Sequence, residues 1–286
     1  YDISLLSIKK AKNFCKGLIN KKTQLDFTTN FNNLPKTIDL LILSNTADSR
    51  LDLIYKFANE RHFHINSWII EKLLSQSLND LNKMKRIFEN RNNVWVSHPR
   101  RVMKWYKDIR SSVTFDKKIK FEVSGYNWGL ACNAVHFFDL FDWWLNSKLT
   151  FLEFNDLGSK WFKSKRKNFI EINGMFNGKY SCGSEVTILS DNKNRDFKIN
   201  ILSEGKNWVL DYKSNKFIGP NGKLIYGKDM LMSELVGPLV NDIILNNSCG
   251  LTKFNDSADY YEKILSCLID HWHKTTNSNS NKIPIT

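Results

Sequence analysis

Apolar and polar positions in the first hundred residues alternate between a strand-like and a helix-like period. Residues 38–43 form a nearly continuous apolar run, as expected of a parallel strand buried on both faces. Residues 65–70 and 94–96 have the same character, and the segments between these runs repeat apolar residues at helical spacing. Strands separated by helices form right-handed βαβ units, so residues 1–99 predict a Rossmann-type parallel sheet.

The start of the chain has a pattern of its own. Residues 2–8 form a short apolar run that predicts another strand, and a lysine-rich helical stretch follows to about residue 22. The sequence begins at Tyr1 without an initiator methionine, and nothing marks a signal peptide. We therefore expect a truncated chain that begins inside a structural unit.

The pattern changes after residue 99, where we place a domain boundary. Residues 118–123 alternate like a half-exposed strand, and residues 129–145 predict a strongly aromatic helix. Between residues 169 and 225, short strands are separated by turns, which Asn-Gly pairs mark at Asn173, Asn177 and Asn221. This half of the chain predicts an α+β domain with an open, mainly antiparallel sheet.

The end of the chain predicts two amphipathic helices, over residues 230–245 and 257–271. They complete an α+β domain that we place over residues 100–276. The polar residues 277–286 are expected to form a flexible tail. The predicted fold class is therefore α/β, with a Rossmann-type sheet followed by an open-sheet domain.

Composition limits the class of protein further. The chain has 286 residues, 42% of them hydrophobic and 13% aromatic, which excludes a disordered chain and allows one large or two ordinary domains. A net charge of +13 raises nucleic acid or an anionic membrane as partner, and the alternative is a lysine-rich solvated surface. No window approaches the roughly 18 consecutive apolar residues of a membrane span. Five scattered cysteines without a CxxC pair argue against a zinc site and favour the cytoplasm.

Candidate chemistry follows the predicted strands, because ligands bind an open α/β sheet beyond the carboxyl ends of its strands. Ser44, Asn45 and Thr46 come directly after one strand and could border a cofactor. Glu71 and Lys72 come after the next, where a lysine could meet a substrate hydroxyl or carbonyl. Taken alone, these two residues could also be a solvated pair at a helix start.

A second group of candidates lies on the aromatic helix. Cys132, His136 and Asp139 are spaced so that they share one helix face. A histidine with an aspartate one turn later resembles a base with its orienting carboxylate. The neighbouring positions are apolar, so the alternative is a satisfied interior histidine. The other five histidines show no metal-ligand spacing.

Together, these two groups resemble the Gfo/Idh/MocA family of NAD(P)-dependent oxidoreductases. In that family a Glu-Lys-Pro motif ends a Rossmann strand, and a catalytic histidine lies in the second domain. The resemblance covers most of the chain. It implies that Lys72 contacts the reacting hydroxyl, with Glu71 on the cofactor side, and that His136 is the acid–base residue with Asp139 one turn beyond it.

The sequence departs from the family pattern in three ways. Leu73 stands where the motif has proline, and Cys132 stands where the family has an aspartate four residues before the histidine. No Gly-x-Gly-x-x-Gly occurs anywhere, which implies that the first strand and its phosphate loop are missing. Ser7, or Lys9 beside it, would then read the adenosine ribose. A serine and a lysine there, instead of an acid, lean toward NADP over NAD.

The expected function is hydride transfer between a nicotinamide and a secondary alcohol or ketone of a sugar or nucleotide sugar, in a homo-oligomer. The candidate substrate-binding residues, all from the predicted second domain, are Arg100, Arg101, Asn127, Trp128, Asn133 and Asp139. One alternative is a non-catalytic relative that binds a ligand or protein, which Leu73 and Cys132 favour. The other is a nucleic-acid-binding module built on the basic, aromatic segment 160–167.

Overall fold

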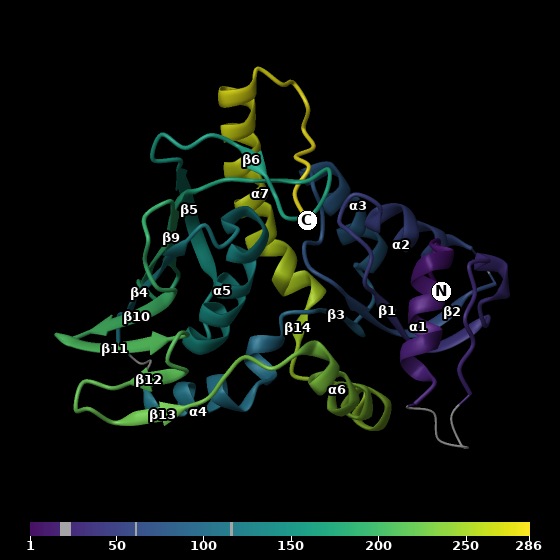
Figure 1. Cartoon of the computed structure of the whole chain (residues 1–286), viewed down its shortest axis with the longest axis horizontal. Coiled ribbons are helices and arrows are strands. Elements are labelled where there is room, and N and C mark those ends of the chain that lie inside the picture. Colours follow the sequence, from purple (N-terminus) through teal and green to yellow (C-terminus); the bar gives the residue numbers. More distant parts are fainter. Residues whose placement is uncertain (18–23, 61, 115–116) are drawn as a thin grey trace.

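The computed structural model describes residues 1–17, 24–60, 62–114 and 117–286, which form two sheets with helices between and around them (Figure 1). The smaller sheet has the strand order β1-β2-β3-β14. Strands β1 (Thr37–Leu43), β2 (His64–Ile70) and β3 (Val94–Val96) are parallel, and β14 (Thr252–Lys253) is antiparallel to β3. Residues from near the far end of the chain thus complete the Rossmann-type sheet.

Two helices of the predicted kind join the parallel strands. Helix α2 (Arg50–Asn59) buries Ile54 and Phe57, and α3 (Leu78–Phe88) buries Leu81, Met84 and Phe88. The side chain of Ser77 accepts a hydrogen bond from the Asp80 amide and so caps α3. The hydrophobic periodicity therefore located both helices.

The predicted strand over residues 2–8 is wrong, because a helix occupies this region. Helix α1 runs from Leu5 to Cys15 and is capped by Ser4. Its apolar residues mostly point to solvent: Leu6 is 63% exposed and Phe14 is 75% exposed. A run of apolar residues predicts a buried strand only if those residues are buried, and here most of them are exposed on a helix. Residues 18–22 of the predicted helical stretch lie outside the described residues.

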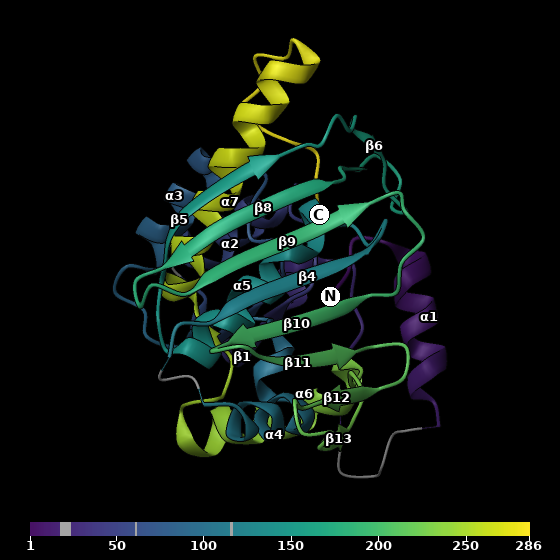
Figure 2. The same cartoon turned by 90° about the vertical axis from the view of Figure 1, so that its left-hand side faces the viewer.

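The larger sheet has the order β13-β12-β11-β10-β4-β9-β8-β5. Its neighbours are antiparallel except for the central pair β4 and β9, which are parallel. The strands are β4 (Lys120–Tyr126), β5 (Leu149–Asn155), β8 (Gly174–Tyr180), β9 (Glu185–Asp191), β10 (Lys198–Ser203), β11 (Lys206–Asp211), β12 (Lys216–Ile218) and β13 (Leu224–Tyr226). Among the described residues, no helix covers the broad face of this sheet that is turned toward the viewer in Figure 2.

Two predicted turns in this sheet are wrong. Gly174 of the Asn173-Gly174 pair begins β8 and pairs with Ser190 of β9. Asn177-Gly178 lies inside β8, where Gly178 pairs with Val186 of β9 and Leu152 of β5. A Cβ atom on Gly178 would come within 2.9 Å of Leu149 and 3.0 Å of Val186, so the glycine serves close packing rather than a turn. Asn221-Gly222 is the predicted turn, and Gly222 has a positive φ of 73°.

Helices α5 (Leu130–Leu145) and α7 (Phe254–Thr276) lie between the two sheets (Figure 1). Phe141 of α5 stacks on Phe121 of β4 with ring centroids 4.0 Å apart. The remaining elements are α4 (Lys104–Ser112), α6 (Met232–Asn246), the hairpin β6 (Phe162–Lys163) and β7 (Ile170–Glu171), and the 3-10 turns at Phe31–Asn33 and Pro99–Val102. Among the described residues, no helix is long and apolar enough to cross a membrane.

The sequence predicts that residues 277–286 fray, but the structure anchors the last four of them. Ile283 and Ile285 are fully buried. The Ile283 amide donates to the Gln76 carbonyl, and the Gln76 side chain donates to the Ile285 carbonyl. The burial of Ile283 and Ile285, together with the hydrogen bonds to Gln76, thus fixes the end of the chain against the loop that follows β2.

Candidate active site

The side chain of Lys72 joins the two halves of the molecule. Lys72 follows β2, and its Nζ atom lies 3.0 Å from Cys132 Sγ and 3.1 Å from Asn133 Oδ1, both at the start of α5. The peptide bond between Lys72 and Leu73 is cis. The ammonium group is therefore placed beside the N-terminal turn of the helix that carries His136.

His136 lies one turn further along α5 and pairs with a second histidine. Its Nδ1 atom is 3.3 Å from Nδ1 of His98, which follows β3 and is 1% exposed. Sequence analysis missed His98, although it directly follows a strand end, as Lys72 does. Among the described residues, no group of three His, Cys, Asp or Glu side chains is arranged to hold a metal ion.

Both imidazoles are neutral at physiological pH. Burial and the positive charges of Arg101, Lys72 and Arg100 lower the pKa of His98 well below its usual value. Burial, together with Arg100, His98 and Lys72, lowers the pKa of His136 in the same way. His136 is partly exposed, so it is the ring of the two that can meet a ligand.

Glu171 is a further buried group that the sequence did not reveal. Its Oε2 atom accepts a hydrogen bond of 2.9 Å from the Ala131 amide in the first turn of α5. Burial raises the pKa of this carboxyl to about 7, while the Ala131 amide and Lys72 oppose the rise. Glu171 thus caps α5 and remains within electrostatic range of Lys72.

Arg50 holds together the loops that follow β1 and β2. Its side chain is fully buried, and its guanidinium donates to the backbone carbonyls of Asn45, Glu71 and Leu73. Burial lowers the pKa of Arg50 to about 10, so the group remains charged at neutral pH. The positions of both loops therefore depend on this one side chain.

The expected cofactor-side residues gather along these two loops. Ser44, Asn45 and Thr46 follow β1, and Glu71 follows the neighbouring strand β2 in parallel register. Asn45 Oδ1 is buried without a hydrogen-bond partner in the described part of the chain. An unpartnered acceptor with small polar side chains beside Lys72 fits the nicotinamide end of a dinucleotide.

Ser7 does not lie at the carboxyl end of a strand, as the sequence predicts. It stands in the first turn of α1, exposed, where its amide donates to the Ser4 side chain. Ser7 could read the ribose only if a strand ended at this position. Since the segment is a helix, the basis for that assignment, and for the lean toward NADP, is gone.

Three of the expected substrate contacts lie at or just before the start of α5, where Lys72 meets Cys132 and Asn133 (the Lys72 cluster). Asn133 accepts from Lys72 and donates to the Trp128 carbonyl at 3.0 Å. The Trp128 indole donates to the Leu189 carbonyl at 2.8 Å. Asn127 is exposed, and its side chain accepts a hydrogen bond from Asn173 at 2.6 Å. All three residues are fixed by protein contacts near the start of α5.

The other three expected contacts are engaged within the protein. Asp139 is fully buried, and its carboxylate accepts from Arg101, Thr252 and Tyr260. The Arg101 guanidinium lies 3.0 Å from Asp139 Oδ1, which makes a buried ion pair in place of the expected phosphate contact. Asp139 therefore holds Arg101 inside the molecule and is not placed to touch a substrate.

Arg100 is likewise occupied by neighbouring side chains. Its Nε atom donates to the Tyr106 hydroxyl at 3.2 Å, and its guanidinium pairs with Asp229 at 3.4 Å. It also lies over the Phe137 ring at 4.7 Å. Arg100 acts on the site through its charge, which disfavours protonation of His136.

The anchored C-terminal segment reaches this cluster. The Cys132 thiol donates to the Thr286 backbone oxygen, and the Thr286 hydroxyl accepts from the Ala47 amide at 3.1 Å. Burial raises the pKa of the Cys132 thiol, while Lys72 lowers it. Thr286 thus links the loop after β1 to Cys132 of α5, the same residue that Lys72 contacts.

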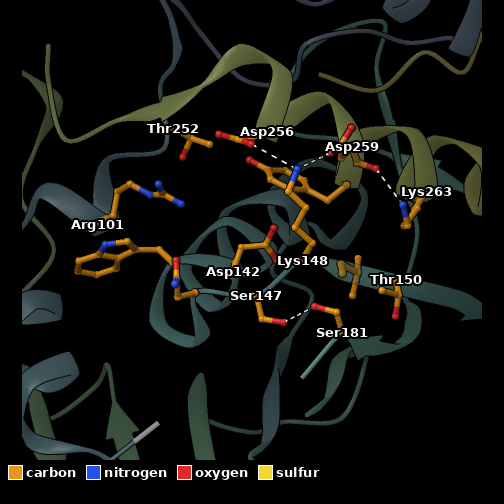
Figure 3. Close-up of a pocket in the computed structure, with 14 residues that line it drawn as sticks. Arg101, Asp142, Ser147, Lys148, Thr150, Ser181, Thr252, Asp256, Asp259 and Lys263 are labelled. Carbon is orange, nitrogen blue, oxygen red and sulfur yellow. Dashed lines mark hydrogen bonds and ion pairs between the residues drawn. The ribbon is translucent and has the colours of Figure 1, made fainter. Parts of the chain in front are cut away.

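A separate cavity of about 670 Å³ lies at the opposite end of α5. In Figure 3, Lys148 pairs with Asp256 and Asp259 of α7, and the hydroxyls of Ser147 and Ser181 hydrogen-bond to each other. Burial and the neighbouring Asp139 raise the pKa of Asp142 in this cavity to about 8. The residues that line this cavity do not include Lys72, Cys132 or His136, and Lys148 forms ion pairs with Asp256 and Asp259 there.

Comparison with known proteins decides the fold. No protein-family model and no curated protein matches the sequence. The UDP-N-acetylglucosamine 3-dehydrogenase GnnA from Acidithiobacillus ferrooxidans matches with a TM-score of 0.60 and 10% identity, over 80% of this chain and 77% of GnnA. A super-repressor mutant of Gal80p from Saccharomyces cerevisiae matches with a TM-score of 0.66 and 11% identity, over 94% and 86% of the chains. The chain has the Gfo/Idh/MocA oxidoreductase fold.

The dehydrogenase MviM from Clostridium difficile has the same fold, with a TM-score of 0.55 and 18% identity over 82% of this chain and 79% of MviM. The predicted fold class, a Rossmann-type sheet followed by an open-sheet α+β domain, is therefore confirmed. In this Gfo/Idh/MocA fold, residues after β2 and β3 meet the N-terminal half of α5, and Thr286 connects the loop after β1 to the same helix. This juncture is the candidate active site.

Proposed function

We propose that the protein is an NAD- or NADP-dependent oxidoreductase that acts on a secondary alcohol or ketone. The observation that carries this proposal is the placement of Lys72 Nζ at the start of α5, one helical turn from His136. A reacting hydroxyl needs a group that stabilises negative charge on its oxygen and a base that takes its proton, and an ammonium group and an imidazole can supply these. Structural neighbours with this fold include a dehydrogenase of UDP-N-acetylglucosamine.

Each residue has a distinct part in this reaction. A bound nicotinamide supplies the redox chemistry by accepting or donating a hydride. Lys72 donates a hydrogen bond to the substrate oxygen and stabilises the negative charge that develops on it. His136 takes the hydroxyl proton at Nε2, because its Nδ1 atom faces His98. Ser44, Asn45, Thr46 and Glu71 border the nicotinamide.

We propose a sugar or nucleotide sugar as the substrate. The end of β6 and the segment that follows it carry four exposed cations, namely Lys163, Lys165, Arg166 and Lys167. The charge of Arg166 reaches the site, since it lowers the pKa of the Cys132 thiol against the larger effect of burial. Cations at the rim of the site favour a substrate that carries phosphate. Asn127, Trp128 and Asn133 would then contact the sugar.

The test is turnover of NAD and NADP by the full-length protein on a panel of sugars and nucleotide sugars. Lys72→Met and His136→Phe should each lower kcat about a hundredfold or more, because each removes a group that acts on the reacting oxygen. Lys83→Met, at an exposed position of helix α3, is the matched control and should leave kcat unchanged. Equal turnover by wild type and both site variants would refute the assignment.

The second candidate function is ligand or partner binding without turnover. One contact favours it: Lys72 meets a thiol at Cys132, where burial raises the pKa and so disfavours the anionic form. The fold also occurs in the transcriptional regulator Gal80p. Saturable binding of a dinucleotide with no redox activity on the whole panel would support this function over the first.

We also propose that the protein assembles as a homo-oligomer through the uncovered face of the eight-stranded sheet (Figure 2). Phe151 on this sheet is 48% exposed, and stable interfaces bury such aromatic residues. Light scattering should give a mass of at least two chains. Phe151→Lys should yield a monomer with unchanged secondary structure, whereas a wild-type monomer would contradict the proposal.

A further inference from the structure

The two histidines and a tyrosine form a continuous line of polar atoms. His136 Nδ1 lies 3.3 Å from His98 Nδ1, and His98 Nε2 lies 3.5 Å from the Tyr261 hydroxyl on α7. His98 is 1% exposed and Tyr261 is fully buried, so water does not compete for these contacts. The rings come from three elements: the end of β3, α5 and α7.

Two facing Nδ1 atoms impose a strict relation between the two rings. A neutral imidazole has one N–H donor and one acceptor nitrogen, so only one of the two Nδ1 atoms can carry the proton of their hydrogen bond. If His136 Nδ1 carries it, His136 Nε2 is a free acceptor and His98 donates from Nε2 to Tyr261. If His98 Nδ1 carries it, His136 Nε2 is protonated and Tyr261 donates to His98.

We propose that His98 is the positioning residue for His136 and shares its proton during the reaction. This inference rests on the proposed function. At rest, His136 Nδ1–H donates to His98 Nδ1 and leaves the Nε2 lone pair toward the substrate. The substrate O–H bond breaks as an N–H bond forms at His136 Nε2, while the C–H electron pair leaves for the oxidised nicotinamide.

The second half of the step moves the positive charge inward. The His136 Nδ1–H bond breaks as a bond forms at His98 Nδ1, so His136 is neutral again and His98 carries the proton. His98 then donates from Nδ1 to His136 and from Nε2 to Tyr261. In the reductive direction the same proton returns along the same atoms. Nothing beyond the substrate and the nicotinamide is consumed.

The groups around the pair explain why a shared proton is useful. Lys72, Arg100 and Arg101 all bring positive charge to the rings, and Tyr260 and Tyr261 pack against His98 with centroids 5.9 Å away. These cations and burial oppose protonation of either ring alone. Spreading one proton over two rings lowers the cost of holding it for the short time between proton uptake and release.

The test uses two substitutions of the buried ring. His98→Phe preserves the ring packing against Tyr261 but removes both nitrogens, whereas His98→Asn places an amide near the former Nδ1 atom. We expect His98→Phe to lower kcat roughly a hundredfold with KM within about twofold of wild type. His98→Asn should recover at least about tenfold of that loss, because it restores a hydrogen-bond partner. His64→Phe, an exposed histidine at the start of β2, should change neither constant.

A second readout does not depend on turnover. The ¹⁵N shifts of the His136 ring in the wild-type protein should show the proton on Nδ1, and in His98→Phe it should move toward Nε2. A wild-type proton on Nε2, or a kcat unchanged in His98→Phe, would overturn the inference. Absence of turnover in the wild type would refute the proposed function instead, and the ring shifts would still decide whether His98 orients His136.

Discussion

The Nζ atom of Lys72 lies 3.0 Å from the Sγ atom of Cys132, although the two residues are sixty positions apart in the sequence. This contact joins the loop after β2 to the first turn of α5. It gives the site two unlike neighbours, a cation and a thiol whose pKa is raised mainly by burial and lowered in part by Lys72. The relationship can be measured without knowledge of any substrate.

Alkylation of Cys132 should report on Lys72. Iodoacetamide at pH 8 should modify Cys132 more slowly than the exposed Cys182, whose hydrogen bonds with Ser147 and Ser184 outweigh the effect of burial and lower its pKa. Lys72→Met should slow Cys132 further, several-fold, because it removes a charge that stabilises the thiolate. Mass spectrometry of the two peptides measures both rates, with Cys182 as the internal control. Faster modification of Cys132 in the variant would contradict the contact.

Stability should fall as pH rises because of Glu171. Burial raises its pKa from 4.5 to about 7, so the folded state binds a proton more tightly than the unfolded chain. The full stability is present below pH 4.5 and decreases until about pH 7. Between pH 5 and pH 8, wild type should lose about 2–3 kcal/mol more unfolding free energy than Glu171→Gln, which stays neutral. Urea unfolding at both pH values measures this difference, and parallel curves for the two proteins would argue against it.

The buried ion pair between Asp139 and Arg101 should be important for stability. Asp139→Asn leaves the Arg101 guanidinium without its counter-charge in the interior, and we expect a loss of about 3–5 kcal/mol. Asp108→Asn is the control, because it removes an exposed partner of Lys104 and should cost about 0.5 kcal/mol or less. Chemical denaturation compares the two variants. Similar losses in both would show that the Asp139 network contributes no more than a surface pair.

The C-terminal segment should be a structural element. Ile285→Ala removes a fully buried side chain and should cost about 2–5 kcal/mol. Ile3→Ala, at a position that is 85% exposed, should have little effect. Limited proteolysis offers a second measurement, because cleavage near residue 280 should be faster in Ile285→Ala than in wild type. Equal cleavage rates would mean that the segment is already free.

The sequence contained enough information to predict the parallel strands, α2, α3, α5 and α7, because each has a strong periodic pattern and a large apolar face. It could not show that the apolar residues of α1 face solvent, since exposure depends on what packs nearby. His98 escaped notice because its partner is thirty-eight residues away. Glu171 lies in the short strand β7, forty residues from Ala131, and no sequence motif connects the two positions. Its role as a cap of α5 is therefore visible only in the folded structure.

The sequence also located some site residues correctly and could not predict the contacts of others. Lys72 and His136 were located by motif and by position after a strand or on a helix, and the structure places them at one juncture. Asp139 lies on the same helix as His136, but its side chain contacts Arg101. Three residues along an α-helix complete less than a full turn, so the side chain of Asp139 points in a direction about 60° away from that of His136. Helical spacing alone could not decide which neighbours would meet each residue.

The buried guanidinium of Arg50 has a consequence for how this site can vary. All three of its partners are main-chain carbonyls, of Asn45, Glu71 and Leu73, and every amino acid provides such a group. New side chains at these positions can therefore be introduced without removing an acceptor from Arg50. The backbone positions of the two loops therefore do not depend on which side chains stand at these three positions. For this reason the loops are well suited to laboratory evolution toward other ligands.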